Sequence, residues 1–129
     1  MKTIIIIAVC VLFALLLGAF GYRSDRKKTE RFLAGRHSRT DDEFGLAFFP
    51  GPRAALASHI RCLLAGWVPG DPSKIEPNDR LDRDLNVDQG NIAEFVETVE
   101  QEFGVNLHEC RGETVKDFVD YIAEVKKIG

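Results

Sequence analysis

Few residues in this chain are of the types and spacing that chemistry requires. His108, Glu109 and Cys110 could each bind a metal, but three consecutive side chains cannot all point at one ion and no matching cluster lies elsewhere in the sequence. We therefore expect no metal site. No serine–histidine–acid or cysteine–histidine set has supporting sequence, and the many carboxylates do not occur in apolar surroundings that would raise a pKa. The sequence predicts a protein that is not an enzyme.

The three cysteines give no sign of a disulfide framework. Cys10 falls in a long apolar segment, and Cys62 and Cys110 are far apart, with no CxxC pair among them. The pattern indicates a reducing environment and excludes a zinc site of the usual spacing.

The stretch LDRDLNVDQGNIAEFVETVEQEFGV, from Leu81 to Val105, has the most informative pattern. Asp88 is a favourable N-cap, and Gly104 is a typical residue at a helix C-terminus. We expect a helix from Gln89 to Phe103. Its buried face is predicted to consist of Ile92, Phe95, Val96, Val99 and Phe103, which recur at helical spacing.

The opposite side of that helix is acidic, and two interpretations apply to it. Glu94, Glu97 and Glu100 are spaced three apart and, with Asp88 at the helix start, could bind a basic surface of a partner protein. The simpler interpretation is that the glutamates form a solvated helix face. Likewise, the turn at Asp88 could be functional or simply a helix cap.

Three further helices and no strands are predicted in this part of the chain. A short helix should run from Asp41 to about Phe48, because Thr40 and Glu43 have capping-box spacing. A longer helix should start near Pro52 or Arg53, and the last one at Thr114. The apolar positions that recur at helical spacing are Leu56, Ile60, Leu63, Leu64 and Trp67 in the longer helix, with His59 beside them, and Val115, Phe118, Val119, Ile122 and Val125 in the last.

The connections between these helices carry their own apolar residues. Ile75 and Leu81 are expected to anchor the long loop after the first long helix, and Val105 and Leu107 should turn inward before the last. Phe44, Phe48 and Phe49 are expected to pack on the domain, the alternative being a membrane surface.

The N-terminus contains an uncharged apolar segment that could cross a membrane. Thr3 to Gly21 are 19 residues without a charge, which would form a helix of about 28 Å, close to the roughly 30 Å of a hydrocarbon core. We expect an uncleaved transmembrane anchor over residues 1–22. The alternative is a secretory signal cleaved before Tyr22, although the apolar segment is long for a signal and only Lys2 precedes it.

A basic segment follows the apolar one and predicts its orientation. Seven Lys/Arg and two acidic residues lie between Arg23 and Arg39. The positive-inside rule then predicts a single-pass protein whose C-terminal domain is cytoplasmic. Residues 23–51 are expected to be a basic linker, or a frayed extension of the first helix, followed by the short helix. Residues 52–129 are expected to be a helical domain that folds alone.

The charge of the remaining chain limits what it binds. From Thr40 onward there are nine Lys/Arg and 18 Asp/Glu, so the predicted domain is strongly acidic although the whole chain carries a net charge of only −3. Nucleic-acid binding needs basic patches and is not expected.

The pattern around Asp88 resembles the acyl carrier protein family at its prosthetic-group site. Asp84, Leu85 and Asp88 match an acidic-Leu-Gly-x-Asp-Ser-Leu pattern, with Asn86 in place of its glycine. The acidic helix ending in Glu102 and Phe103, the loop sequence IEPNDRL and the sequence TVKDFVDYI extend the resemblance over roughly residues 52–127. The resemblance implies an all-α fold, an acyl-carrier-like bundle of three to four helices, here preceded by the transmembrane helix.

The resemblance fails at the residue on which carrier chemistry depends. Gln89 occupies the position of the serine whose hydroxyl forms the phosphodiester with 4′-phosphopantetheine, and Gly90 that of the following leucine. Gln has no hydroxyl, and no Ser or Thr lies between Ser73 and Thr98. We therefore expect no cofactor.

Two functions follow from these patterns. The first is a membrane-tethered, non-enzymatic docking or scaffolding module without phosphopantetheine, whose partner is a protein with a basic surface. The alternative is a working acyl carrier protein of fatty-acid, lipid or polyketide metabolism that is modified at another residue. A small enzyme is a third option, but the chain contains no catalytic set.

Overall fold

Side-chain caps fix the start of three helices in the computed structural model, which describes residues 2–129 except for the side chains of residues 18–23. Thr40 and Glu43 form the predicted capping box of α2 (Asp41–Phe48). Asp88 accepts a hydrogen bond from Asn91 N at the start of α4 (Gln89–Phe103). Thr114 and Asp117 form the capping box of α5 (Val115–Val125). These limits confirm the helices predicted from the cap residues.

The remaining helices are α1 (Lys2–Leu33), α3 (Arg53–Leu64) and a short 3₁₀ turn, η1 (Pro72–Lys74). Across residues 2–129 the chain forms no β-strand, and one antiparallel bridge joins Arg80 to Thr114. The predicted all-α class is confirmed. Of the two alternatives for residues 21–39, a linker or a helix extension, the extension holds as far as Leu33.

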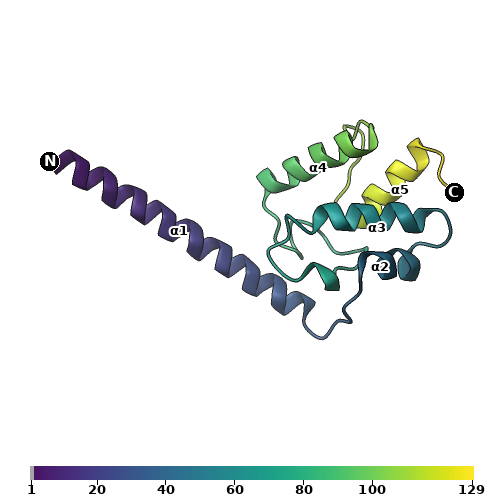
Figure 1. Cartoon of the computed structure of the whole chain (residues 1–129), viewed down its shortest axis with the longest axis horizontal. Coiled ribbons are helices and arrows are strands. Elements are labelled where there is room, and N and C mark those ends of the chain that lie inside the picture. Colours follow the sequence, from purple (N-terminus) through teal and green to yellow (C-terminus); the bar gives the residue numbers. More distant parts are fainter. Residues whose placement is uncertain (1) are drawn as a thin grey trace.

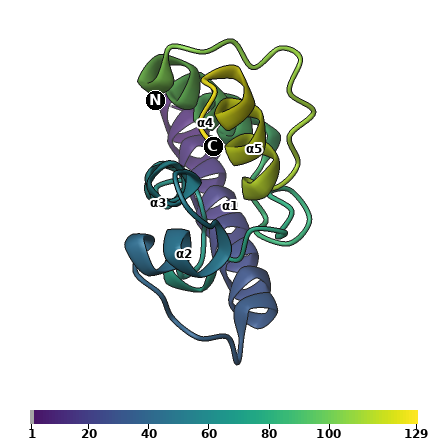
Figure 2. The same ribbon diagram turned by 90° about the vertical axis from the view of Figure 1, so that its right-hand side faces the viewer.

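Helix α3 lies in the middle of the bundle and contacts α2, α4 and α5 (Figure 1). Helix α2 packs against one side of α3, where the backbone of Gly45 comes so close to Ala54 that an added Cβ would lie 2.2 Å from the Ala54 carbonyl oxygen. Figure 2 looks along the bundle and shows α4 and α5 together on the side of α3 away from α2. Gly45 therefore sets how closely α2 and α3 approach.

The core combines the apolar faces of these helices with residues of the loops. Phe95 of α4 and Phe118 of α5 meet edge to face with ring centroids 5.5 Å apart. The core also includes the loop residues Ile75, Leu81 and Leu107, as predicted. The other helical members that the sequence predicted are Leu56, Ile60, Leu64, Val99, Val115, Val119 and Ile122.

Some residues of the predicted stripes are less buried than expected. Val125, the last residue of α5, is 52% exposed, so its predicted burial was wrong. Ile92, Val96, Phe103 and Val105 lie at the margin of the core and are half-buried. The predicted phase of α4 is correct, and only its central residues Phe95 and Val99 are fully covered.

One buried arginine holds α2 and two loops against α3. Arg61 has only 4% of its surface exposed. Its Nε donates to Asp41 Oδ1 at 2.7 Å, its NH2 group donates to the Arg39 carbonyl at 2.7 Å, and its guanidinium lies over the ring of Phe44. A buried charge requires such partners. Arg61 therefore holds α2 in place in addition to the apolar contacts of the core.

The core begins earlier in the chain than residue 52. Leu33 at the end of α1 and Phe44 and Phe49 around α2 are all buried in it. The predicted packing of the phenylalanines on the domain is therefore confirmed for Phe44 and Phe49, which are buried, and for Phe48, which packs at the edge of the core. The division of the chain at residues 22 and 51 stays a prediction, but a fragment starting at residue 52 would lack three core side chains.

The N-terminal half of α1 extends away from the bundle (Figure 1). Its apolar side chains up to Leu17 are exposed, and Ile4 keeps 71% of its surface. Within the part of the chain whose structure is described, no helix meets both the length and the apolarity needed to cross a membrane. The predicted span, residues 3–21, includes residues 18–21, whose side chains lie outside the described part, as do those of Tyr22 and Arg23.

We predict that Phe95→Ala destabilises the fold far more than Phe103→Ala does. Phe95 is 1% exposed and packs on Phe118, so its truncation should cost about 3–5 kcal/mol. Phe103 is half-buried and meets the ring of His59 with centroids 4.9 Å apart, so its truncation should cost less. Urea titration of a fragment of residues 25–129, which retains the whole core, measures both; equal losses would contradict the packing described.

Candidate functional site

The loop before α4 is built to hold the start of that helix. Leu81, Leu85 and Val87 are all buried. The Leu81 N–H donates to the Glu113 carbonyl at 2.9 Å, and the Val87 N–H donates to the Leu81 carbonyl at 2.9 Å. The loop is therefore tied both to itself and to the segment before α5. As a result, Asp88 and the first turn of α4 have a fixed position on the bundle.

Asn86 gives this loop its sharp turn. Its φ is 56°, in the left-handed region that favours glycine and that Asn tolerates better than most residues. Its side chain donates to the hydroxyl of Thr29 at 3.1 Å and to the Asp84 carbonyl at 3.3 Å. Asn86 stands where the resemblance places a glycine, and the positive φ gives that correspondence a physical basis.

Thr29 of α1 holds this loop through hydrogen bonds to Leu85 and Asn86. It is fully buried, and its Oγ1 lies 2.9 Å from the Asp25 carbonyl oxygen and 3.0 Å from the Leu85 carbonyl oxygen, so its single hydroxyl proton can be donated to either. Gly70 packs against the other side of Thr29, where a Cβ would come within 2.7 Å of the threonine methyl. The end of α1 is therefore a structural part of the site.

Gln89 lies at the first position of α4 and is exposed to solvent. Beside it is a depression of about 260 Å³ lined by Leu81, Asp82, Gln89, Ile92, Gly112 and Glu113. Its wall is partly apolar and partly acidic, and no residue that lines it carries a hydroxyl. Arg80 pairs with Glu113 at the same end, at 3.0 Å. The residues that line the depression offer two carboxylates and a carboxamide, but no hydroxyl to which a phosphopantetheinyl group could be attached.

The four acidic residues predicted to bind a partner separate into two pairs. Asp88 caps α4. Glu100 is half-buried, and its Oε2 accepts a hydrogen bond from the Leu107 N–H at 3.0 Å. Glu94 and Glu97 are exposed on α4. The first pair therefore has a structural function, and the second pair is free to meet another molecule.

The other residues considered for chemistry have structural positions. His59 pairs with Glu102, with 3.1 Å between Nε2 and Oε1, at the core edge where it was expected. No group of three or more potential metal ligands occurs among the residues described, and Cys10, Cys62 and Cys110 are all free. Burial raises the pKa of the Cys110 thiol, which makes it less reactive than an exposed one.

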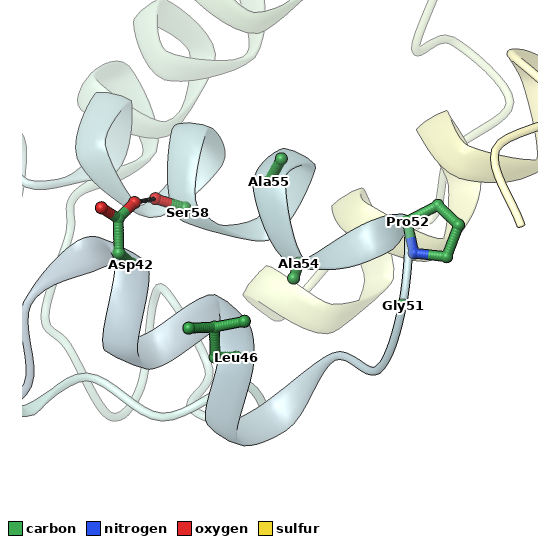
Figure 3. Close-up of a pocket in the computed structure, with 7 residues that line it drawn as sticks. All are labelled: Asp42, Leu46, Gly51, Pro52, Ala54, Ala55 and Ser58. Carbon is green, nitrogen blue, oxygen red and sulfur yellow. Dashed lines mark hydrogen bonds between the residues drawn. The ribbon is translucent and has the colours of Figure 1, made fainter.

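A second depression lies away from this site, between α2 and α3. It has a volume of about 400 Å³, and Asp42 and Ser58 bridge its edge with a 3.1 Å hydrogen bond (Figure 3). Leu46 at its rim is 76% exposed. It contains no set of side chains that points to a reaction.

Sequence patterns did not identify two of the residues that form the site. Thr29 lay in a segment expected to be a basic linker, and the only signal was its spacing of four from Leu33, which puts both on one face of α1. Val87 fills a position that varies in the carrier pattern, yet it is 3% exposed. Threonine is common on protein surfaces and a single valine in a polar loop gives no periodicity, so only the docking of α1 on the loop reveals these two residues.

Comparison with known proteins supports the carrier resemblance at a distance. The chain is 29% identical over 73 residues to an acyl carrier protein of Thermosynechococcus vestitus, an alignment that covers 54% of this chain and 90% of that protein. No protein-family profile matches the chain, and no solved structure matches it significantly. A carrier protein is not an enzyme, so the similarity supports the prediction that this chain is non-enzymatic.

We predict that Glu100→Gln and Glu97→Gln differ in their effect on stability. The amide oxygen of a glutamine at this position can still accept from the Leu107 N–H, but it lacks the charge that strengthens this hydrogen bond, so Glu100→Gln should cost about 1 kcal/mol. The same change at exposed Glu97 should alter the free energy of unfolding by less than about 0.5 kcal/mol. Thermal unfolding of the two variants side by side makes the comparison. An unchanged melting temperature for Glu100→Gln would contradict the structural function given to it.

Proposed function

We propose that this chain is a membrane-tethered docking module: an acyl-carrier-like helical domain that carries no phosphopantetheine and binds a basic surface of another protein. The observation that carries the proposal is Gln89, exposed at the first position of α4 and directly after the capping residue Asp88. In the carrier pattern that position bears the serine to which the prosthetic group is attached.

The chemistry of Gln89 is the first support for the proposal. A carboxamide is not a nucleophile for phosphoryl transfer, so the phosphodiester cannot form there. The nearest hydroxyl further along α4 is that of Thr98, which is half-buried and donates to the Glu94 carbonyl at 2.9 Å. Thr114, on the other side of the depression, is occupied as the cap of α5. The hydroxyls near the site therefore have structural functions.

The apolar half of α1 supports the membrane tether. Exposed isoleucine, leucine and phenylalanine side chains from Ile4 to Leu17 would be costly in water, since burying each would contribute about 1.5–3 kcal/mol. A lipid environment would cover them on all sides of the helix. The exposed Arg26, Lys27, Lys28 and Arg31 that follow suit the cytoplasmic face of a membrane.

The charge of the domain supports a basic partner. Glu94 and Glu97 are exposed on the middle turns of α4, and Asp82 and Glu113 line the depression at its start. Long-range attraction between such a surface and a basic one would speed association and would weaken with salt. The simpler interpretation, a solvated helix face, predicts no binding and no salt effect.

A working acyl carrier is the second candidate, because the similarity extends over nine-tenths of a carrier protein. It would require attachment to another residue. The mass of the chain after reaction with a transferase distinguishes the two functions.

We predict that Gln89→Ser alone stays unmodified by a broad-specificity phosphopantetheinyl transferase with coenzyme A, and that Gln89→Ser with Gly90→Leu is modified. The carrier pattern has an apolar side chain after the serine, and Gly90 lacks one. A Cβ on Gly90 would meet only the Asp88 carboxylate, at 3.3 Å, so a side chain there requires that carboxylate to shift by a few tenths of an ångström. Intact-mass spectrometry shows attachment as the added mass of one phosphopantetheinyl group.

The matched control for that experiment is Gln89→Ala with Gly90→Leu, which keeps the apolar residue but has no hydroxyl. It should stay unmodified, together with the wild-type chain. Attachment to wild-type protein under the same conditions would contradict the proposed function and favour the second candidate.

We predict that Glu94→Gln with Glu97→Gln weakens the capture of a partner from detergent-solubilised membranes. The variant removes two exposed charges without touching the cap or the Glu100 hydrogen bond, so the fold should be unaffected. Capture by the wild-type chain should also fall between 0.1 and 1 M salt, over which the Debye length drops from about 10 Å to about 3 Å. Glu124→Gln, an exposed change on α5, is the control; equal capture by all variants would contradict the acidic docking surface.

A further inference from the structure

Helix α1 is joined to the domain by a buried contact and not by a flexible linker. Thr29 and Leu33, one turn apart, are 0% and 1% exposed. Beyond the helix, Arg36 donates to Asp79 Oδ2 at 2.6 Å, and this hydrogen bond raises the pKa of the Arg36 guanidinium above its ordinary value. Asp79 is itself buried and also accepts from the Glu76 N–H at 2.8 Å. These contacts form a joint between α1 and the loops that precede α4.

The joint lies close to the apolar segment along one continuous helix. Thr29 lies eight positions after Gly21, the end of the predicted span, and α1 is unbroken from Lys2 to Leu33. At 1.5 Å per residue this is a distance of about 12 Å along the helix axis. A helix of two turns cannot bend freely, so the direction of the apolar segment and the orientation of the domain are coupled.

The start of α4 lies on the side of the domain from which α1 departs. In Figure 1 the N-terminal end of α4 and the N-terminal half of α1 are directed toward the same side, whereas the C-terminal ends of α4 and of the chain lie at the far side. Figure 2, viewed from that far side, shows α1 running back behind the bundle. The loop residues that precede α4, Leu85 and Asn86, are the ones that Thr29 contacts.

We propose that the Thr29–Leu33 joint holds the domain in one orientation at the membrane, with the start of α4 facing the bilayer, so that the partner of this site is a protein that itself lies at the membrane surface. This inference rests on the membrane tether proposed above. A partner in bulk solution would meet the far end of the domain first, whereas a membrane protein with a basic surface would meet Asp82, Gln89 and Glu113.

The electrostatics explain why such a joint would be needed. A strongly acidic domain is repelled by an anionic membrane surface over about one Debye length, roughly 8 Å at physiological ionic strength. A flexible tether would let the domain move away from the surface. The buried hydroxyl of Thr29 and the side chain of Leu33 resist that movement, and the exposed Arg26, Lys27 and Lys28 lie between the apolar segment and this joint.

The orientation can be measured with one fluorophore at either end of α4. In the full-length chain with Cys10, Cys62 and Cys110 replaced by alanine, Gln89→Cys and Gln101→Cys give two labelled proteins; both positions are exposed and lie about 18 Å apart along the helix. Each is reconstituted in phosphatidylcholine–phosphatidylglycerol vesicles that contain a headgroup-bound nickel-chelate quencher. We expect a several-fold excess of quenching at position 89 over position 101.

Two variants test whether the joint causes that difference. A Gly-Ser-Gly-Ser insertion between residues 23 and 24 leaves Asp25, Thr29 and Leu33 in place but uncouples the domain from the span, and it should abolish the difference between the two positions. Thr29→Val, which keeps the shape but loses the hydrogen bonds, should reduce it. Circular dichroism of each variant checks that the helices remain.

The outcomes separate this inference from the proposed tether. Failure of the chain to float with the vesicles would overturn the tether. Flotation with equal quenching at positions 89 and 101 would leave the tether intact and overturn the orientation. A difference that persists undiminished in the insertion variant would overturn the function given to the joint.

Discussion

The buried hydroxyl of Thr29 is the contact on which the arrangement of the site depends. It joins the carbonyl of Leu85 and the amide of Asn86 to α1, in a place that water does not reach. Leaving these groups without a partner would cost about 1–3 kcal/mol, a large fraction of the stability of a small domain. The positive φ of Asn86, the cap at Asp88 and the direction of α4 all follow from how this loop is held. The end of α1 therefore belongs to the domain.

Local signals in the sequence predicted the helices well, because each is encoded by adjacent residues. Thr40 with Glu43, Asp88, and Thr114 with Asp117 form the caps that their types and spacing predict. Contacts between distant segments were not predictable in the same way. Thr29 meets Leu85 across 56 residues and Arg61 meets the Arg39 carbonyl across 22. For the same reason the sequence predicts one exposed, partner-binding group of Glu94, Glu97 and Glu100. Of these three, Glu100 accepts a hydrogen bond from the distant Leu107 N–H.

The site combines a distant resemblance to carrier proteins with a glutamine, Gln89, to which phosphopantetheine cannot be attached. The chain is distantly similar to an acyl carrier protein over 73 residues, and its helix α4 carries exposed acidic residues. Gln89 keeps a polar, exposed side chain at the helix start but supplies no nucleophile. In the function proposed above, this surface binds a partner without an attached prosthetic group, and the exposed apolar half of α1 would confine that binding to a membrane.

The most direct test of the central claim is the intact mass of the chain extracted from the membranes in which it is naturally made. We expect the mass of the unmodified polypeptide, with the N-terminal apolar segment retained. A mass increased by a phosphopantetheinyl group, with or without an acyl chain, would contradict it and identify the protein as a working carrier.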